Sequence, residues 1–362
     1  MIEVHAEYAP SSMALTVACP GWRQQTKLMP PQQPTEATRE GETAHAVAAA
    51  MAAGLRPTTD DEGVTQEMID DAWLWVEALE GYPAKIETPV PIRRIHMTKC
   101  WGTPDAWQWS PETRILRVAD YKYGHAFVDE FENWQLLAYA AGLVDLVGID
   151  DRDTDVRLQL TVVQPRFYGG EPIRTWSISL PELWPYLERM QEAVREAETP
   201  GARTTSGTHC VYCPARATCK TLQKTIANAV DFAERADPML STPDDIGREL
   251  WLVQEFIKRL EARATGLEAL AEGHIRAGRR VPYFNLEQTV GRLAWVVPPD
   301  VVEMTANLAG KTAYRPRELI TPTQARERKI LDARVMSAYA DRPLGKFKLV
   351  PDSTKTARRF TQ

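Results

Sequence analysis

The chain has 362 residues, of which 44% are hydrophobic and 25% are charged, which is typical of globular proteins with one large domain and an appendage, or with two domains. No apolar run approaches the roughly 18 residues of a membrane helix, and the N-terminus, MIEVHAEYAP, lacks the basic start and apolar core of a secretory signal. We therefore expect a cytoplasmic protein without a membrane partner.

The net charge of −6 is unevenly distributed along the chain. Residues 311–362 contain 13 Lys plus Arg against 5 Asp plus Glu, a balance of +8, so residues 1–310 carry −14. This asymmetry predicts a basic tail that meets phosphate backbones or an acidic partner. A solvated tail without a partner would have the same composition.

The hydrophobic pattern predicts an α/β protein: a mixed central β-sheet flanked by helices, with a mainly helical C-terminal extension. A soft domain boundary near residue 235 separates a first domain, 1–235, from a second, 236–362. The expected elements are, in chain order, helices at 13–19, 38–54 and 65–79, strands at 86–96, 100–109 and 115–123, a helix at 130–147, strands at 156–167 and 173–180, helices at 181–198 and 246–277, and a hairpin at 281–296.

The segment GTPDAWQWSPETRILRVADYKYG, residues 102–124, carries the strongest chemical signal in the chain. It places Asp105 and Asp120 on neighbouring expected strands, with Lys122 two residues further on. Cleavage of a phosphodiester uses a divalent cation held by hard oxygen ligands, with a positive charge near the attacking water. The alternative is structural, with Asp105 in a hairpin turn and a surface ion pair between Asp120 and Lys122.

Two expected helices add polar groups to this pattern. His45 follows Glu42 by three residues, so both lie on one helix face, and an imidazole can complete a carboxylate metal site. Gln135 and Tyr139 are four residues apart and also share a face. Each feature alone is equally compatible with ordinary helix packing.

The spacing of the cysteines indicates a second metal-binding site. Three thiols in HCVYCPARATC have C-x2-C-x5-C spacing, and in a cytosolic protein this favours a metal over disulfides. A fourth ligand must come from elsewhere, either from the cysteine of ACPGW near the N-terminus or from His209, and zinc is the general expectation. Cys100 is expected to pack as a small buried residue. The five cysteines are Cys19, Cys100, Cys210, Cys213 and Cys219.

Taken together, these motifs resemble the RecB-type branch of the PD-(D/E)XK nuclease superfamily. The resemblance runs in that family's order through GETAH at 41–45, GTPD at 102–105, DYK at 120–122 and the Gln135/Tyr139 pair. It implies a restriction-endonuclease-like core. It also implies Mg²⁺ or Mn²⁺ ligands, which would be His45, Asp105, Asp120 and the backbone carbonyl of Tyr121.

The same resemblance assigns the remaining roles. Lys122 would orient or activate the attacking water, and Gln135 and Tyr139 would contact the DNA backbone. Glu42 and Glu87 would support the metal ligands.

The cysteines extend the resemblance to a subset of these nucleases, which includes AddB-type helicase–nucleases and CRISPR-associated exonucleases. Members of this subset carry one cysteine before the nuclease motifs and three after them, and these hold a 4Fe–4S cluster that ties the two ends of the domain together. Cys19 with Cys210, Cys213 and Cys219 fits that arrangement, so the resemblance implies an iron–sulfur cluster rather than zinc.

The function expected from this resemblance is a metal-dependent DNA exonuclease that acts on linear single- or double-stranded DNA. The segments RRVPYFNLEQTVGRLAWV and ELITPTQARERK of the C-terminal third resemble uncharacterised phage and prophage proteins of this nuclease group. This resemblance implies a phage or prophage origin, a site of action in the host cytoplasm, and phage recombination or annealing proteins as partners. The rival expectation is a catalytically inactive iron–sulfur or zinc protein that binds DNA or acts as a scaffold.

The C-terminal third offers fewer motifs. Arginines at 279, 280 and 292, with aromatic residues at 283, 284 and 295, are available for binding DNA strands, whereas a packed hairpin would use the same aromatic residues as core. The long helix at 246–277 is either a wall of a DNA channel or a subunit interface of a homo-oligomer.

Overall fold

A mixed five-stranded sheet forms the centre of the fold. A computed structural model of the chain describes residues 6–27, 29, 35–79, 84–234, 242–286 and 304. Neighbouring strands run antiparallel except for the central pair β5 and β6, which is parallel. The strands are, in sheet order, β1 (Lys85–Ile86), β4 (Ala106–Ser110), β5 (Ile115–Tyr121), β6 (Arg157–Val163) and β7 (Ile173–Ser179).

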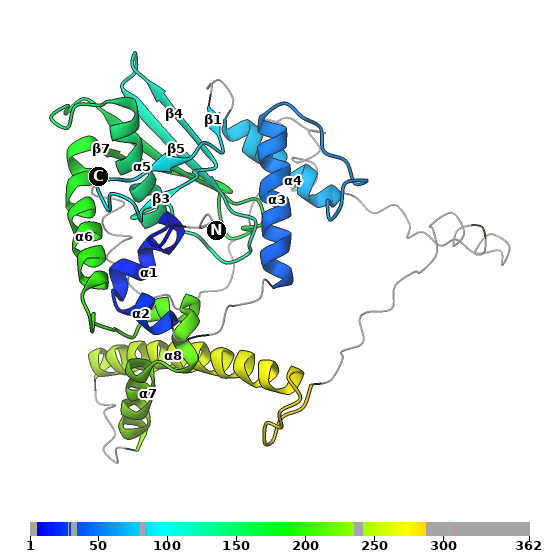
Figure 1. Cartoon of the computed structure of the whole chain (residues 1–362), viewed down its shortest axis with the longest axis vertical. Helices are drawn as coiled ribbons and strands as arrows, with labels where there is room; N and C mark the ends of the chain where they lie inside the picture. Colours follow the sequence, from blue (N-terminus) through cyan, green and yellow to red (C-terminus); the bar gives the residue numbers. More distant parts are fainter. Residues whose placement is uncertain are drawn as a thin grey trace. The chain divides into compact units, whose positions relative to one another are not determined.

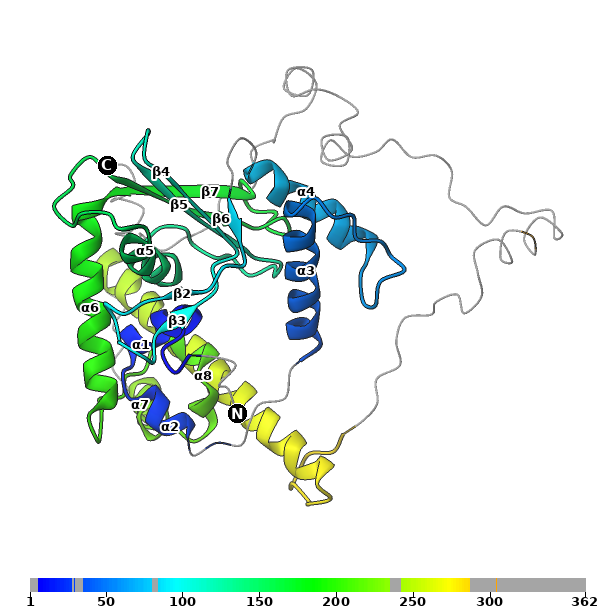
Figure 2. The same ribbon diagram turned by 45° about the horizontal axis from the view of Figure 1, so that its top comes forward.

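Helices cover both faces of the sheet, as Figures 1 and 2 show. On one face, α5 (Trp134–Val147) and α6 (Leu180–Glu198) pack on Leu116, Val118 and the apolar residues of β6. On the other face, α3 (Glu36–Ala52) and α4 (Gln66–Ala78) pack on Ala119 and Tyr121. Successive residues of a strand point to opposite faces, so β5 contributes to both cores. The expected α/β class with a mixed, helix-flanked sheet is confirmed.

Local sequence sets the limits of these helices. Asn133 caps α5 because its side-chain oxygen accepts hydrogen bonds from the backbone N–H groups of Gln135 and Leu136. Gly148 ends the helix with φ 72°, in the left-handed conformation that glycine adopts without strain. Thr35 and Thr65 cap α3 and α4 in the same way as Asn133. These caps fix the residues at which α3 and α5 begin.

The N-terminal segment and the segment after α6 lie together at one end of α6. The N-terminal elements are η1 (Pro10–Ser12), α1 (Met13–Ala18) and α2 (Trp22–Thr26). The later elements are η2 (Thr208–Tyr212), η3 (Pro214–Ala217) and α7 (Lys220–Ala233), followed by the long α8 (Pro243–Arg276). Contacts join α1 to α6 and η2, and α2 to η3. Segments from opposite ends of the expected nuclease domain therefore meet.

Two strand predictions were wrong in length. Residues 86–96 and 100–109 were each expected to form one strand, but they supply only parts of β1 and β4 and the two short strands β2 (Val90–Pro91) and β3 (Trp101–Gly102), which pair with each other. Pro89 lies between β1 and β2, and Pro104 lies between β3 and β4. They explain the breaks, because proline has no N–H to donate to a strand ladder.

The contacts of the chain define a compact unit that runs to Gly273, and the described residues from His274 onward belong to a second unit. The predicted boundary near residue 235 lies outside the described residues, as does most of the predicted hairpin at 281–296. Within the described residues, none of the helices combines the length and apolarity that crossing a membrane requires.

Candidate functional site

Asp120 is a carboxylate placed on the apolar face of β5. Leu116 and Val118 precede it on the same face and are fully buried under α5. Asp120 itself is only 2% exposed. Because a buried charge is costly without partners, its surroundings determine whether it is ionised.

The partners of Asp120 come from Lys122 and from α5. Gln135 donates from Nε2 to Asp120 Oδ1 over 2.8 Å, and Lys122 Nζ lies 3.0 Å from Oδ1 and 2.8 Å from Oδ2. Lys122 Nζ also donates to Gln135 Oε1 over 3.3 Å. Oδ2 is buried and accepts no well-directed hydrogen bond from any described residue. This oxygen has a lone pair available for a cation.

Asp105 brings a second carboxylate to the same place from the turn between β3 and β4. Its Oδ2 accepts a hydrogen bond of 2.7 Å from the backbone N–H of Tyr121, and its Oδ1 lies 3.4 Å from His45 Nδ1 on α3. The His45 ring also meets the Tyr121 ring edge to face, at 5.5 Å between centroids. One side-chain atom each of His45, Glu87 and Asp105 lies within 4.8 Å of the others. An imidazole and two carboxylates thus converge.

Glu87 reaches this group through an unusual backbone conformation. Its φ is +45°, a region that side-chain-bearing residues rarely adopt, and its backbone N–H donates to the Asp105 carbonyl over 3.2 Å. Outliers of this kind cluster at functional sites because the surrounding structure must hold them in place. We therefore count Glu87 as a member of the site.

The electrostatics of the group show concentrated negative charge. Burial, and then the charge of Asp105, raises the pKa of Glu87 to about 7. Burial also raises the pKa of Asp120 above its usual range, although Lys122 opposes this effect. Burial acts to lower the pKa of Lys122 and of His45, but neighbouring carboxylates outweigh it and hold both above their ordinary values. Carboxylates crowded in this way favour a bound cation.

Tyr139 holds the turn that carries Asp105. It is buried one helical turn after Gln135, and its hydroxyl donates to the Thr103 carbonyl over 3.0 Å. Burial raises the pKa of its phenol above the ordinary value. The role expected for Tyr139, contact with the DNA backbone, stays a prediction. The observed bond adds a structural role in positioning Asp105.

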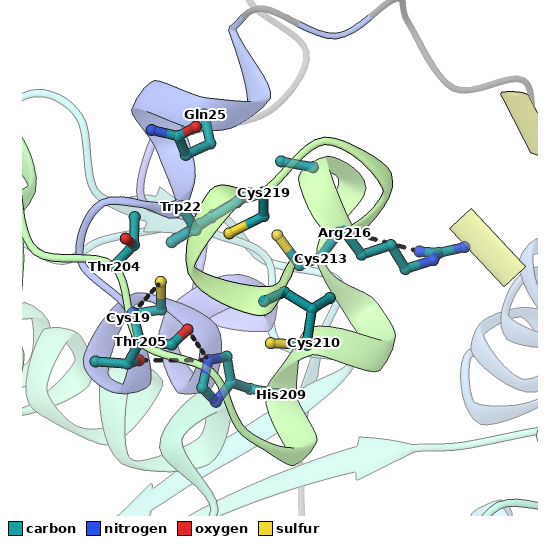
Figure 3. Close-up of a pocket in the computed structure, with 12 residues that line it drawn as sticks. Cys19, Trp22, Gln25, Thr204, Thr205, His209, Cys210, Cys213, Arg216 and Cys219 are labelled. Carbon is teal, nitrogen blue, oxygen red and sulfur yellow. Dashed lines mark hydrogen bonds between the residues drawn. The ribbon is translucent and has the colours of Figure 1, made fainter. Parts of the chain in front are cut away.

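Four of the five cysteines line one pocket between the N-terminal segment and η2, η3 and α7 (Figure 3). Cys19 ends α1 and accepts a hydrogen bond at Sγ from the Thr205 N–H over 3.3 Å, and Cys210 Sγ accepts one from the Gly207 N–H over 3.4 Å. Burial, and to a smaller extent the other three thiols, raises the pKa of Cys213 to about 11. The four side chains are therefore electrostatic neighbours.

The donor set of this pocket is rich in sulfur. Apolar side chains such as Trp22 and Leu222 complete the lining, and His209 lies there with Nε2 3.2 Å from the Thr205 carbonyl. Among the described residues, no three of the thiol sulfurs lie within 4.8 Å of one another. The void between them is about 10 Å³, the space of one water molecule. A larger group requires the thiols to rotate outward.

Sequence comparison places the chain in a family. Residues 5–357 match the model of a family described as a protein of unknown function, DUF2800. This chain belongs to the DUF2800 family. No curated protein matches it. The DUF2800 assignment covers nearly the whole chain and leaves its activity open.

The structure of this DUF2800 protein brings most of the predicted site residues together in two groups. His45, Asp105, Asp120, Lys122 and Gln135 converge at the end of β5, and Cys19, Cys210, Cys213 and Cys219 line the second pocket. Glu42 is exposed on α3, and Cys100 is buried elsewhere, its pKa raised to about 12 by burial alone. Arg292 and Trp295 lie outside the described residues, while Tyr283 and Phe284 are exposed.

Sequence reasoning missed a buried polar hub next to the site. Gln164 is fully buried after β6, donates from Nε2 to the Gly124 and Ala126 carbonyls, and accepts at Oε1 from the Val128 N–H and from Arg174 Nη2. It thereby orders the loop that follows Lys122. A single glutamine at the end of the apolar run LTVVQ was the available signal.

Proposed function

We propose that this DUF2800 protein is a metal-dependent deoxyribonuclease of the RecB-like, PD-(D/E)XK type, acting as an exonuclease on DNA ends. The observation that carries the proposal is the convergence of His45, Asp105, Asp120 and Lys122 from three separate segments. A mixed sheet with this convergence at the end of its central strand is also what the resemblance to that superfamily implies.

The side chains present suit a hard divalent cation. His45, Glu87, Asp105 and Asp120 offer one nitrogen and several carboxylate oxygens, and Asp120 Oδ2 is buried without a directed hydrogen bond. These are the donors that Mg²⁺ and Mn²⁺ bind. When bound, such an ion lowers the pKa of a coordinated water and stabilises charge on the phosphate.

Each protein group has a role that follows from its position. Lys122 stays protonated beside Asp120, so its ammonium group can stabilise negative charge that develops on a phosphate. Gln135 bonds both residues and fixes their relative orientation. Tyr139 holds the Asp105 turn through Thr103. The carbonyl of Tyr121 remains a proposed ligand at the end of β5.

We further propose that Cys19, Cys210, Cys213 and Cys219 hold a 4Fe–4S cluster. Thiolate ligands suit both iron–sulfur clusters and zinc. Backbone N–H groups directed at Cys19 and Cys210 stabilise negatively charged sulfur in either case. No three of the thiol sulfurs lie within 4.8 Å of one another, as the ligands of one tetrahedral zinc ion would, and this supports a larger group.

The decisive experiment is degradation of end-labelled linear DNA, single- and double-stranded, with Mg²⁺ or Mn²⁺ and with closed circular DNA as a second substrate. We expect loss of label from linear DNA only. Asp120→Asn and Lys122→Met should be inactive while remaining folded at the assay temperature. Two exposed residues outside the site provide matched controls, Asp231→Asn and Lys220→Met, which should retain full activity.

Several outcomes would contradict the proposal. Equal degradation by the site variants and the control variants would show that another group, or a contaminant, cleaves the DNA. DNA binding without cleavage under any metal would support the rival function, an inactive iron–sulfur or zinc protein that binds DNA. Cleavage of closed circles as fast as linear DNA would replace the exonuclease with an endonuclease.

A further inference from the structure

One face of α8 packs against the cysteine-containing segment. Ala262 is buried in a cluster with Cys210 and Cys219. At Gly266 the approach is so close that a Cβ atom would lie 2.7 Å from Arg216 Cγ. On the same side Arg263 donates to the Ala217 carbonyl over 3.0 Å. These contacts place Ala262, Arg263 and Gly266 on the face of α8 that lies against the cysteine-containing segment.

The opposite face of α8 is apolar and uncovered. Its six large residues are between 37% and 51% exposed in the described structure, whereas Leu136, Leu137 and Leu143 on α5 are fully buried. Two alanines complete a continuous line. We call this line the α8 stripe, and it consists of Ile246, Leu250, Val253, Ile257, Leu260, Ala264, Leu267 and Ala271.

The spacing of the α8 stripe is that of a coiled coil. Successive members are separated by four and three residues in strict alternation from Ile246 to Ala271. A helix that packs on a globular core usually has a wider apolar face with a period of 3.6 residues, whereas a 3.5-residue period sustained over more than three heptads specifies packing against another helix. The occupant of this stripe is therefore a helix of comparable length.

We propose that the α8 stripe pairs with the same stripe of a second copy of this chain, in antiparallel orientation. Such a pair sets Ile257 against the partner's Leu260 at its centre and Val253 against the partner's Ala264. Leu250 meets the partner's Leu267 further out. Each alanine of the stripe thus faces a larger apolar residue of the partner, so no layer of the core consists of alanines alone.

The residues that flank the stripe are compatible with this pairing. In the antiparallel alignment Gln254 faces the partner's Glu261, and Gly247 faces the partner's Glu268. No flanking position sets like charges against each other, which would oppose association. The stripe thus matches itself in shape, and its flanks add no repulsion between like charges.

The rest of the chain offers no stripe of matching length. After residue 286, the longest stretch without proline is 323–342, which is shorter than 246–271. Proline removes a helix hydrogen bond and usually ends a helix. A second copy of α8 is the partner whose length and spacing match.

The test is the mass of the full-length protein in solution, measured by size-exclusion chromatography with light scattering. One chain has a mass of 40.8 kDa, and we expect the wild-type protein at twice that mass. Ile257→Glu with Leu260→Glu brings four carboxylates to the centre of the pair, so this variant should have the mass of one chain. The control Lys258→Gln with Thr265→Glu makes the same charge change at exposed positions of α8 outside the stripe and should remain a dimer.

Helical circular dichroism should be equal in all three proteins, because the substituted residues are exposed within one chain. If the glutamates disturb folding, Ile257→Ala with Leu260→Ala should still raise the dissociation constant at least tenfold in sedimentation experiments. A wild-type protein of single-chain mass at every concentration would overturn the proposal, whether the stripe is then covered by another part of this chain or by a different protein. A dimer unaffected by the stripe variants would overturn it as well.

Discussion

Gln135 donates a 2.8 Å hydrogen bond from Nε2 to Oδ1 of Asp120, and its own Oε1 accepts from Lys122. One amide from α5 thus orients both charged residues at the end of β5. Because Asp120 is buried and carries a raised pKa, loss of this donor would leave its carboxylate with Lys122 as its only hydrogen-bond donor among the described residues. The geometry makes Gln135 a sensitive probe of the site.

We predict that Gln135→Leu lowers the rate of DNA degradation about 10–100-fold, the usual effect of removing a group that orients a metal ligand. The free energy of unfolding should fall by about 1–3 kcal/mol, because a buried charged acceptor loses a partner. Degradation assays and urea unfolding measure the two effects.

The matched control is Gln191→Leu. Gln191 on α6 donates a 2.8 Å hydrogen bond to the Arg94 carbonyl, away from the site. Its loss should lower stability by a similar amount but leave the activity of the folded protein unchanged. Equal activity loss in both variants would show that Gln135 acts only through stability.

The sheet and the long helices were predictable because local pattern and tertiary packing agree. β5 alternates between two cores, with Leu116 and Val118 on one face and Ala119 and Tyr121 on the other. The helix predicted at 130–147 ends at Val147 as expected, although it begins at Trp134. The breaks at Pro89 and Pro104 were not predicted, because the apolar composition suggested continuous strands whose hydrogen bonding proline interrupts.

The candidate site was predictable only as a set of residue types in order. Sequence spacing gave Asp105, Asp120 and Lys122, while their convergence depends on the register of β4 and β5. The approach of Glu87 depends on a backbone φ of +45° that no hydrophobic pattern indicates. The hydrogen bonds that Gln164 makes to the loop after Lys122 likewise follow from the tertiary fold alone.

Cys19→Ser should remove the proposed cluster and destabilise the protein. We expect the wild-type protein to be brown as purified, with stoichiometric iron and acid-labile sulfide, and the variant to be colourless. The proposed cluster would join the start of the chain to the segment after α6. Its loss should therefore lower the free energy of unfolding by about 4 kcal/mol, as for other cross-links that close long loops.

Cys100→Ser tests whether this effect is specific. Cys100 is equally buried but lies outside the pocket of the other four cysteines, so its variant should retain iron, sulfide and colour. Zinc in place of iron in anaerobically purified wild-type protein would contradict the cluster. Full iron content in Cys19→Ser would remove Cys19 from the ligand set.

Two glycine substitutions should have opposite effects on stability. At Gly142 on α5, an added Cβ would lie 2.8 Å from Ile92 Cγ1 and 3.0 Å from the Pro91 carbonyl oxygen. We therefore predict that Gly142→Ala lowers the free energy of unfolding by about 1–3 kcal/mol, as overpacking does. At Gly247 on α8 nothing lies within 4 Å, so Gly247→Ala should raise it by about 0.5–1 kcal/mol through helix propensity.

Urea unfolding of the two glycine variants measures the predicted decrease and the predicted increase in the free energy of unfolding. Stabilisation by Gly142→Ala would mean that β2 and α5 are less closely packed than the structure shows. Destabilisation by Gly247→Ala would mean that a contact covers the start of α8.

Glu87 should show a conflict between stability and function. Its left-handed backbone costs an L-residue roughly 1–2 kcal/mol, and its carboxyl group lies among other acidic groups, which raises its pKa to about 7. Glu87→Gly relieves both effects, so we predict a gain of up to about 1 kcal/mol after the entropy cost of glycine. The same variant removes a candidate metal ligand, so the Mg²⁺ concentration that gives half-maximal activity should rise about tenfold or more.

Glu87→Asn separates the two contributions. Asparagine tolerates the left-handed conformation better than glutamate does, so this variant should share part of the gain in thermal stability. It retains a side-chain oxygen but not the charge. The Mg²⁺ concentration that gives half-maximal activity should therefore lie between the values for the wild-type protein and Glu87→Gly. A lower melting temperature in both variants would show that the Glu87 side chain contributes to folding. An unchanged metal requirement in both would exclude it from the metal site, leaving His45, Asp105 and Asp120 as the remaining candidate side-chain ligands.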